Sequence, residues 1–287
     1  MKEKIKLYGS ILILVIFVPY LITVYLQGGG LFFSESRSDQ TMEEQLIGVL
    51  AEEIPASCES ECIKAQAVIA RTNLVSGSGK GWTEAEMKQA WGEHYEQYLE
   101  KIKNAVSHTR GEILTCEGKP IQAAFHAVSS KKTRTAGEVP GQEAYTYLVG
   151  VDSSADIEAE NFLSIRYVSK QEAADALQKV FEEETVTAEQ LPGALQITGR
   201  DSADYVTKVK YNRTVANGEA VRSALNLPSA CFYLSELDGQ IRIVTKGIGH
   251  GLGLSQYGAN EMAKKGYKYR EILDYYFHDI EITQYQK

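Results

Sequence analysis

Proline, cysteine and histidine are scarce in this chain, and its basic residues are outnumbered by acidic ones. The 287 residues include six prolines and 24 glycines, too few for a fibrous protein or for long disorder. Hydrophobic residues make up 44% of the sequence and charged residues 24%, as in globular proteins with a packed core. The length that remains after the first 34 or so residues corresponds to one large domain or two small ones.

Basic charge is lacking after the extreme N-terminus. Beyond residue 6 the chain holds 27 Lys and Arg against 37 Asp and Glu, and its overall formal charge is −8. Nucleic-acid binding needs a dense basic surface. The composition therefore excludes nucleic acid as an expected partner, and any anionic ligand has to be bound by a few local basic residues.

The four cysteines do not define a disulfide framework by their spacing. Cys58, Cys62, Cys116 and Cys231 allow three pairings, and the sequence does not choose among them. Cys58 and Cys62 lie four residues apart near a predicted helix start, where a bridge between them would be strained. A structural zinc site at these thiols is an alternative, although no second Cys or His pair stands at ligand spacing. We expect no metal or other cofactor.

The N-terminus has the pattern of a membrane anchor. Three lysines precede a stretch from Leu7 to Ser34 that contains no charged residue. Residues 7–26 supply about 20 mostly apolar positions, enough to cross a bilayer, and the lysines favour a cytoplasmic N-terminus. A cleaved signal peptide is the alternative, but the apolar stretch is long for one and no small-x-small cleavage site follows. The predicted division is a cytoplasmic stub and single-pass anchor (1–27), a tether (28–40) and an extracytoplasmic domain (41–287).

Helical patterns come first in the domain, and strand patterns come later. Thr41 and Glu44 form a capping box that opens a helix ended by Pro55. A second helix is predicted from about Glu59 to Val75, because its apolar residues recur on one side. Further elements are a polar helical segment to about residue 106, a helix over 169–183, strands at 195–200, 205–211, 231–237 and 240–246 with an Asp238-Gly239 hairpin turn, and a helix near 270–276.

The runs EILTC and IQAAFHAV, joined by EGKP, are typical of a hairpin that brings His126 to the end of a strand. Residues 153–192 fit an inserted lobe. The fold class predicted from these elements is α+β: an N-terminal transmembrane helix, then a mixed helix and mainly antiparallel sheet ectodomain with the inserted lobe.

The segment GIGHGLGLSQYGA, residues 247–259, carries the strongest signal for a functional loop. Its glycines let the backbone pass close to a ligand or another strand. It presents His250 after a strand and Ser255, Gln256 and Tyr257 at a helix start, where free N–H groups can bind an oxygen. The pattern is not a dinucleotide fingerprint, because no βαβ context surrounds it. A glycine-rich crossover with a hydrogen-bonded histidine is the structural alternative.

Glu52 and Glu53 lie at the C-terminal end of the first predicted helix. The negative end of the helix dipole raises the pKa of a carboxyl there, which suits a general acid near neutral pH. Two solvated acids are the alternative.

Lys64 and Arg71 lie seven residues apart on one edge of the second predicted helix. They can bind a carboxylate or orient a sugar. The alternative is that they are surface residues with buried stems.

Five segments occur in an order that resembles the stage II sporulation protein D family of endospore-forming bacteria. They are LAEEIP, ECIKAQAVIARTN, AAFHAVSSKKT, YLVGVDS and GHGLGLSQYGANEMAKKGYKYREILDYYF. The resemblance covers about residues 43–282 and is weakest over 153–192. It implies a membrane-anchored lytic transglycosylase that cleaves peptidoglycan glycan lacking stem peptides during forespore engulfment. A cell-wall amidase and other engulfment proteins are the partners that it implies.

The resemblance also implies roles for individual residues. The family's catalytic Glu maps onto Glu53, and its substrate-binding positions map onto Lys64, Arg71, His126, Ser129, His250, Ser255, Gln256 and Tyr257. Relatives commonly have His-Ser-x-Ser-Gly-Gly where this chain has HAVSSK from His126, and the cysteines that bind zinc after that histidine in some relatives are missing here. A non-catalytic wall-binding module related to the amidase enhancers is the alternative function.

Overall fold

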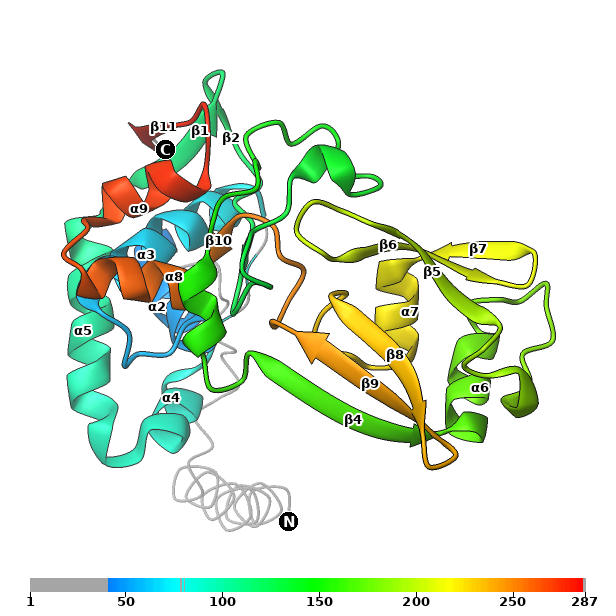
Figure 1. Cartoon of the computed structure of the whole chain (residues 1–287). Helices are drawn as coiled ribbons and strands as arrows, with labels where there is room; N and C mark the ends of the chain where they lie inside the picture. The colour runs from blue at the N-terminus through cyan, green and yellow to red at the C-terminus, as the bar shows by residue number, and fades with distance from the viewer. Residues whose placement is uncertain (1–40, 78, 80, 286–287) are drawn as a thin grey trace, which may run out of the picture. The chain divides into compact units, whose positions relative to one another are not determined.

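The computed structural model of the chain describes residues 41–77, 79 and 81–285 (Figure 1). The predicted anchor and tether lie outside these residues. In the part of the chain that is described, no helix has the length and apolar character needed to span a bilayer. The membrane anchor and the extracytoplasmic location therefore stay predictions.

A first hydrophobic cluster forms around α3 (Ser60–Val75), which packs against α2 (Met42–Glu53), α5 (Tyr95–His108), α8 (Gln256–Lys264) and α9 (Tyr269–Tyr276). The predicted apolar stripe is buried, but so are the other sides of α3: nearly every residue from Cys62 to Thr72 is inaccessible to solvent. A helix that is covered on all sides must satisfy its polar side chains internally. This burial decides the roles of several predicted site residues.

The helix predicted up to about residue 106 is divided in two. α4 (Glu84–Trp91) opens on a Thr83–Glu86 capping box and stops at Gly92, whose φ of 50° breaks the helix before α5 begins. A short 3₁₀ turn (Gly92–His94) joins them.

The predicted hairpin after α5 is correct only at its turn. β1 (Glu112–Cys116) pairs with β2 (Lys119–Pro120) and, on its other edge, with the final strand β11 (Glu281–Gln284). The chain then leaves this sheet, and β3 (Phe125–His126) pairs in parallel with β10 (Leu254–Ser255).

Two contacts divert this segment from the hairpin. The Asn73 side chain accepts from the Ala123 N–H at 3.1 Å and donates to its carbonyl at 3.0 Å. Gly253, with φ of 67°, lets the glycine-rich loop approach Ala124 so closely that a Cβ would collide with its carbonyl. His126 therefore does lie at the end of a strand, but the partner of that strand is β10, a distant part of the chain, and not β1.

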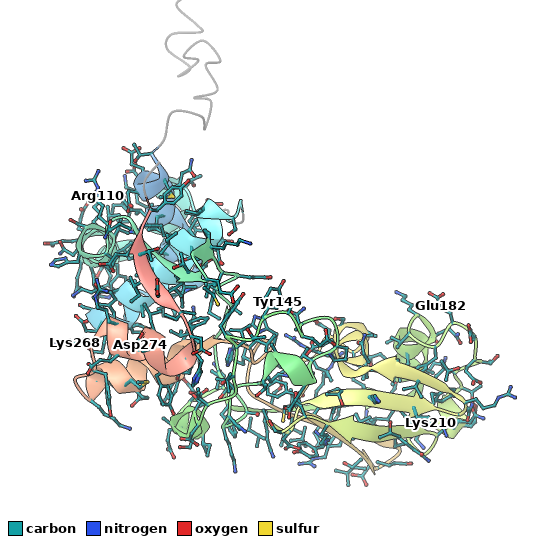
Figure 2. The ribbon with its side chains drawn as sticks, turned by 90° about the horizontal axis from the view of Figure 1, so that it is seen from above. Arg110, Tyr145, Glu182, Lys210, Lys268 and Asp274 are labelled. Carbon is teal, nitrogen blue, oxygen red and sulfur yellow. The ribbon has the colours of Figure 1, made fainter. Side chains whose placement is uncertain are left out.

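A second hydrophobic cluster is built from two three-stranded antiparallel sheets and two helices (Figure 1). The elements are β4 (Leu163–Ser169), β9 (Gln240–Lys246) and β8 (Phe232–Leu237); β5 (Leu195–Arg200), β6 (Val206–Tyr211) and β7 (Thr214–Asn217); and α6 (Lys170–Gln178) and α7 (Gly218–Ala224). The Asp238-Gly239 turn between β8 and β9 is confirmed, with both residues at positive φ. This cluster draws on residues from Val168 to Ile243, well beyond the 153–192 segment that the sequence suggests as an inserted lobe. Figure 2 shows Glu182 and Lys210 on this cluster and Arg110 and Lys268 on the first.

Candidate functional site

Glu53 is the last residue of α2, and its carboxyl is largely shielded from solvent. Burial raises the pKa of Glu53 to about 7, a hydrogen bond from Gln66 lowers it, and the charge of neighbouring Glu52 raises it. From the sequence, the helix dipole was expected to raise the pKa of Glu53. In the structure, the largest cause of the raised pKa is burial of the carboxyl away from solvent. A carboxyl of this pKa is present in both protonation states at neutral pH.

Two carboxamides hold Glu53 in place. Gln66, on α3 and fully buried, donates from Nε2 to Glu53 Oε2 at 3.1 Å. Gln256, the first residue of α8, donates from Nε2 to the Glu53 backbone carbonyl at 2.7 Å and to Gln66 Oε1 at 3.5 Å. The backbone carbonyl of Gln256 accepts from Cys62 Sγ at 3.6 Å. The fold thus brings predicted residues Glu53 and Gln256 together from 203 positions apart.

The raised pKa of Glu53 has a consequence for stability. The folded state keeps this proton up to about pH 7, whereas an ordinary glutamate, as in the unfolded chain, loses it near 4.5. Stability is therefore lost as pH rises from about 4.5 to about 7. Glu53→Gln removes the titration, so we expect the variant to be more stable than wild type at pH 8, by up to about 3 kcal/mol, and to have no such advantage at pH 4.

Urea unfolding of both proteins at pH 4, 6 and 8 measures this difference. A stability difference that does not change with pH would show that Glu53 titrates like an exposed glutamate.

The predicted cationic pair, Lys64 and Arg71, does not form a strip beside Glu53. Lys64 Nζ forms an ion pair with Glu61 at 2.7 Å and its side chain keeps 19% exposure. Arg71 is fully buried: its guanidinium forms two hydrogen bonds to Glu43, at 2.8 and 2.9 Å, and donates to the carbonyls of Val106 and Glu112. These contacts give Arg71 a structural role, and the predicted contact with substrate does not fit them.

His126 and His250 come together, with ring centroids 5.8 Å apart. His126 Nδ1 donates to the Leu252 carbonyl at 3.0 Å, and burial, with a smaller effect of His250, lowers the pKa of His126 to about 3. His250 Nδ1 accepts from the Leu252 N–H, and burial lowers its pKa as well. Both rings are therefore neutral at neutral pH and cannot act as cations for a glycan carboxylate.

The predicted hydroxyl residues are joined by a carboxylate that the sequence did not suggest. Asp156, in a 3₁₀ turn (Ser154–Glu158), accepts on Oδ2 from the Ser129 N–H at 2.5 Å and from Ser255 Oγ at 2.7 Å. Ser255 also caps α8 by accepting from Gly258 N–H. All three residues are buried, so Ser129 and Ser255 support the loop, while Tyr257 in the first turn of α8 remains partly exposed.

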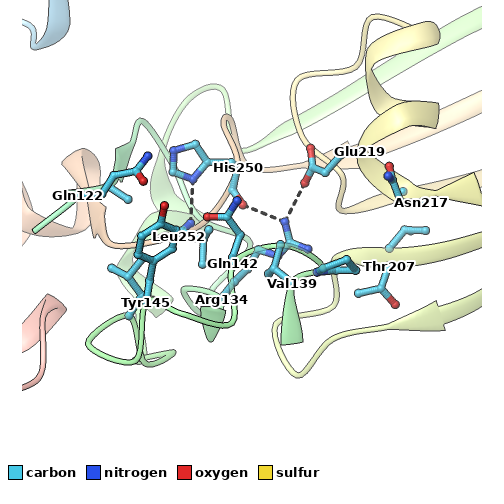
Figure 3. A pocket seen from close by; sticks show the side chains of 15 residues that line it. Gln122, Arg134, Val139, Gln142, Tyr145, Thr207, Asn217, Glu219, His250 and Leu252 are labelled. Atoms are coloured by element: carbon cyan, nitrogen blue, oxygen red, sulfur yellow. Dashed lines mark hydrogen bonds and ion pairs between the residues drawn. The ribbon is translucent and has the colours of Figure 1, made fainter. Parts of the chain in front are cut away.

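A cavity of about 360 Å³ is lined by residues of both hydrophobic clusters (Figure 3). Its polar lining includes Gln122, Gln142, Tyr145, Thr207, Asn217 and His250. Glu53 does not line it. The segment 250–256 connects the cavity with Glu53: His250 lines the cavity, and Gln256 donates a hydrogen bond to the Glu53 backbone carbonyl.

Charges at the cavity wall are balanced by ion pairs. Arg134 donates from Nη1 to Glu219 at 2.7 Å and to the His250 carbonyl at 3.1 Å (Figure 3). Its Nε donates to Asp201 at 2.6 Å. Arg222 also pairs with Glu219, at 3.0 Å. Two basic and two acidic groups thus compensate one another, which leaves a wall without net charge.

The four cysteines are free thiols. Over the described ranges, no cluster of three or more His, Cys, Asp or Glu side chains is arranged to hold a metal ion.

Sequence reasoning missed Gln66, Asp156 and Arg134. Gln66 lies between Lys64 and Arg71 in the segment ECIKAQAVIARTN, which resembles the family motif. Its place in this motif could have marked it as a candidate site residue. Asp156 bonds to residues 27 and 99 positions away in the chain, and Arg134 bonds to residues 67 or more positions away, so no local pattern marks these contacts.

Comparison with known proteins gives a consistent set of relatives. The family model "Stage II sporulation protein" matches residues 36–116. The chain is 36% identical to stage II sporulation protein D of Bacillus amyloliquefaciens over 264 residues, which cover 85% of this chain and 74% of that protein. It is 34% identical to stage II sporulation protein D of Bacillus subtilis (strain 168) over 271 residues, 88% of this chain and 77% of that one. The amidase enhancer of Bacillus subtilis (strain 168) is 23% identical over 287 residues, 84% of this chain and 40% of that protein.

Proposed function

Because this chain belongs to the stage II sporulation protein D family, we propose that it is a lytic transglycosylase that cleaves the glycan strands of peptidoglycan. The observation that carries the proposal is the setting of Glu53: a largely buried carboxyl with a pKa of about 7, bonded to an uncharged amide. Such a group can both donate and accept a proton at neutral pH.

A single carboxyl is sufficient for this reaction. Glu53 protonates the glycosidic oxygen as the bond to the anomeric carbon breaks. The C6 hydroxyl of the same sugar then attacks that carbon, and Glu53 takes the hydroxyl proton, so that a 1,6-anhydro ring forms and the carboxyl is restored. Hydrolytic glycosidases generally need a second carboxylate, as nucleophile or as a base for water. The neighbouring Glu52 is exposed to solvent.

The cavity is the place where we expect part of the glycan to bind. The carboxamides and the tyrosine of the cavity can form hydrogen bonds with the acetamido and hydroxyl groups of the glycan. The apolar side chains of Val139, Leu148 and Leu252 can pack against the flat face of a sugar ring. Its compensated charges favour uncharged parts of the strand. The sequence analysis offered Lys64 and Arg71 as residues that can bind a carboxylate, such as the lactyl group of a peptide-free glycan. Arg71 is buried and is therefore not available for this contact.

Tyr145→Ala should weaken binding of peptide-free glycan strands by about tenfold, because it removes an aromatic face and a hydroxyl from the cavity. Isothermal titration calorimetry with the full-length protein measures the loss. Tyr167→Ala is the matched control: this tyrosine lies on β4, outside the cavity, with 49% exposure. Equal affinities for all three proteins would place glycan binding elsewhere.

The resemblance further supports a role in forespore engulfment, at the outer face of the cell membrane and together with a wall amidase that removes stem peptides. We propose this location and partnership as well.

The similarity to an amidase enhancer supports a second candidate, a wall-binding module without catalysis. The two are separated by incubating full-length protein with peptide-free glycan: release of soluble anhydro-sugar products supports the enzyme, and retention of intact strands without product supports the module.

A further inference from the structure

Gln66 contacts the side chain of Glu53, whereas Gln256 contacts its backbone. Among the described residues, a hydrogen bond reaches Oε2 of Glu53 and none reaches Oε1. We propose that Gln66 is the positioning residue of Glu53: its amide holds Oε2 and thereby leaves Oε1 as the oxygen that exchanges protons with the sugar. This role rests on the proposed transglycosylase function.

The orientation of the Gln66 amide is determined by its surroundings. Its Oε1 accepts from Gln256 Nε2, and the Gln256 amide is in turn oriented by the Glu53 backbone carbonyl, which can only accept. The Gln66 NH₂ group must therefore face the carboxyl of Glu53, where it can only donate. Gln66 is fully buried on α3, so its side chain has little freedom to move away.

Both protonation states of Glu53 are needed for the two proton transfers, and Gln66 acts on the balance between them. Burial favours the protonated form, and so does the charge of Glu52 on the same helix. The groups that reach Glu53 from α3 and α8, Gln66 and Gln256, are neutral carboxamides. Donation by Gln66 favours the ionised form, and this opposes the burial effect.

Gln66→Met tests the proposal, because methionine has nearly the same volume and no hydrogen-bond donor. We expect the pKa of Glu53 to rise by about one unit or more, since a hydrogen bond to a charged group is lost. This is measured by ¹³C NMR titration of the carboxyl carbon in full-length protein labelled at glutamate, with the signal assigned by its absence in Glu53→Gln. In the pH–rate profile for glycan cleavage, the alkaline limb should move up by the same amount, and kcat should fall about tenfold or more with little change in KM.

Gln178→Met is the matched control. Gln178 donates to two backbone carbonyls in the second hydrophobic cluster, so its replacement costs hydrogen bonds without touching Glu53. We expect this variant to keep the wild-type pKa and rate.

Gln66→Glu is a second variant that keeps the shape of the side chain. It places two carboxyls in contact, so Glu53 should titrate in two coupled steps. An unchanged Glu53 titration in both Gln66 variants would reduce Gln66 to a packing residue and overturn the proposal. The titration is read without substrate, so it stands or fails independently of the activity. Absence of glycan cleavage by the wild-type protein would refute the proposed function, and cleavage by Glu53→Gln would refute the catalytic role of Glu53; both results leave the titration valid.

Discussion

Replacing Glu53 with glutamine is expected to lower kcat for glycan cleavage by about 10³-fold while KM changes little. Glutamine fills the same space and can still bond to Gln66 and Gln256, so the site keeps its shape. It has no proton to give to the leaving oxygen, and an amide does not accept the proton of the C6 hydroxyl. The rate is measured as release of soluble sugar from peptide-free glycan by the full-length protein.

Glu100→Gln is the control for this variant, because it makes the same change of charge at an exposed position of α5. We expect wild-type activity from it. If Glu53→Gln retains most of the wild-type rate, proton transfer by Glu53 is not part of the reaction.

Arg71→Met is expected to lower the free energy of unfolding by about 3–5 kcal/mol, the effect of removing one member of a buried ion pair. The guanidinium joins Glu43 on α2 to Thr109 and to the carbonyl groups of Val106 and Glu112, so its loss leaves these polar groups without their donor. Urea unfolding at pH 7 measures the change.

Lys88→Met offers a contrast at the surface. Lys88 pairs with Glu84, but both side chains are more than half exposed, so its replacement should leave stability nearly unchanged. If Arg71→Met unfolds like wild type but binds glycan more weakly, then Arg71 contacts substrate as the sequence suggested, and the structural role is wrong.

Local patterns in the sequence were sufficient for features that depend on neighbouring residues. The helix predicted over 59–75 is observed at Ser60–Val75, and the Asp238-Gly239 turn forms as expected, because apolar spacing and turn chemistry act over a few positions. The glycine-rich loop also behaves as predicted, since Gly249 and Gly253 have positive φ and pass close to β3 and the residue before it.

Features that depend on distant contacts were not predictable in this way. Spacing on α3 shows that Lys64 and Arg71 share an edge, but it does not show that other helices cover that edge and bury Arg71. The hairpin after β1 ends at Pro120, because Asn73, about 50 positions earlier, forms hydrogen bonds with both backbone groups of Ala123. The pairing of Gln66 with Glu53 likewise depends on how α2 and α3 pack.

The identity of the product from peptide-free glycan tests the central claim most directly. Glu53 is proposed to use the sugar's own C6 hydroxyl as nucleophile, so no oxygen from water enters the new sugar end. When the full-length protein cleaves the strands in H₂¹⁸O, mass spectrometry should show ends that are 18 Da lighter than reducing ends and contain no ¹⁸O. Reducing ends that carry ¹⁸O would show that water is the nucleophile, and an absence of any cleaved product would show that the protein is not the enzyme proposed here.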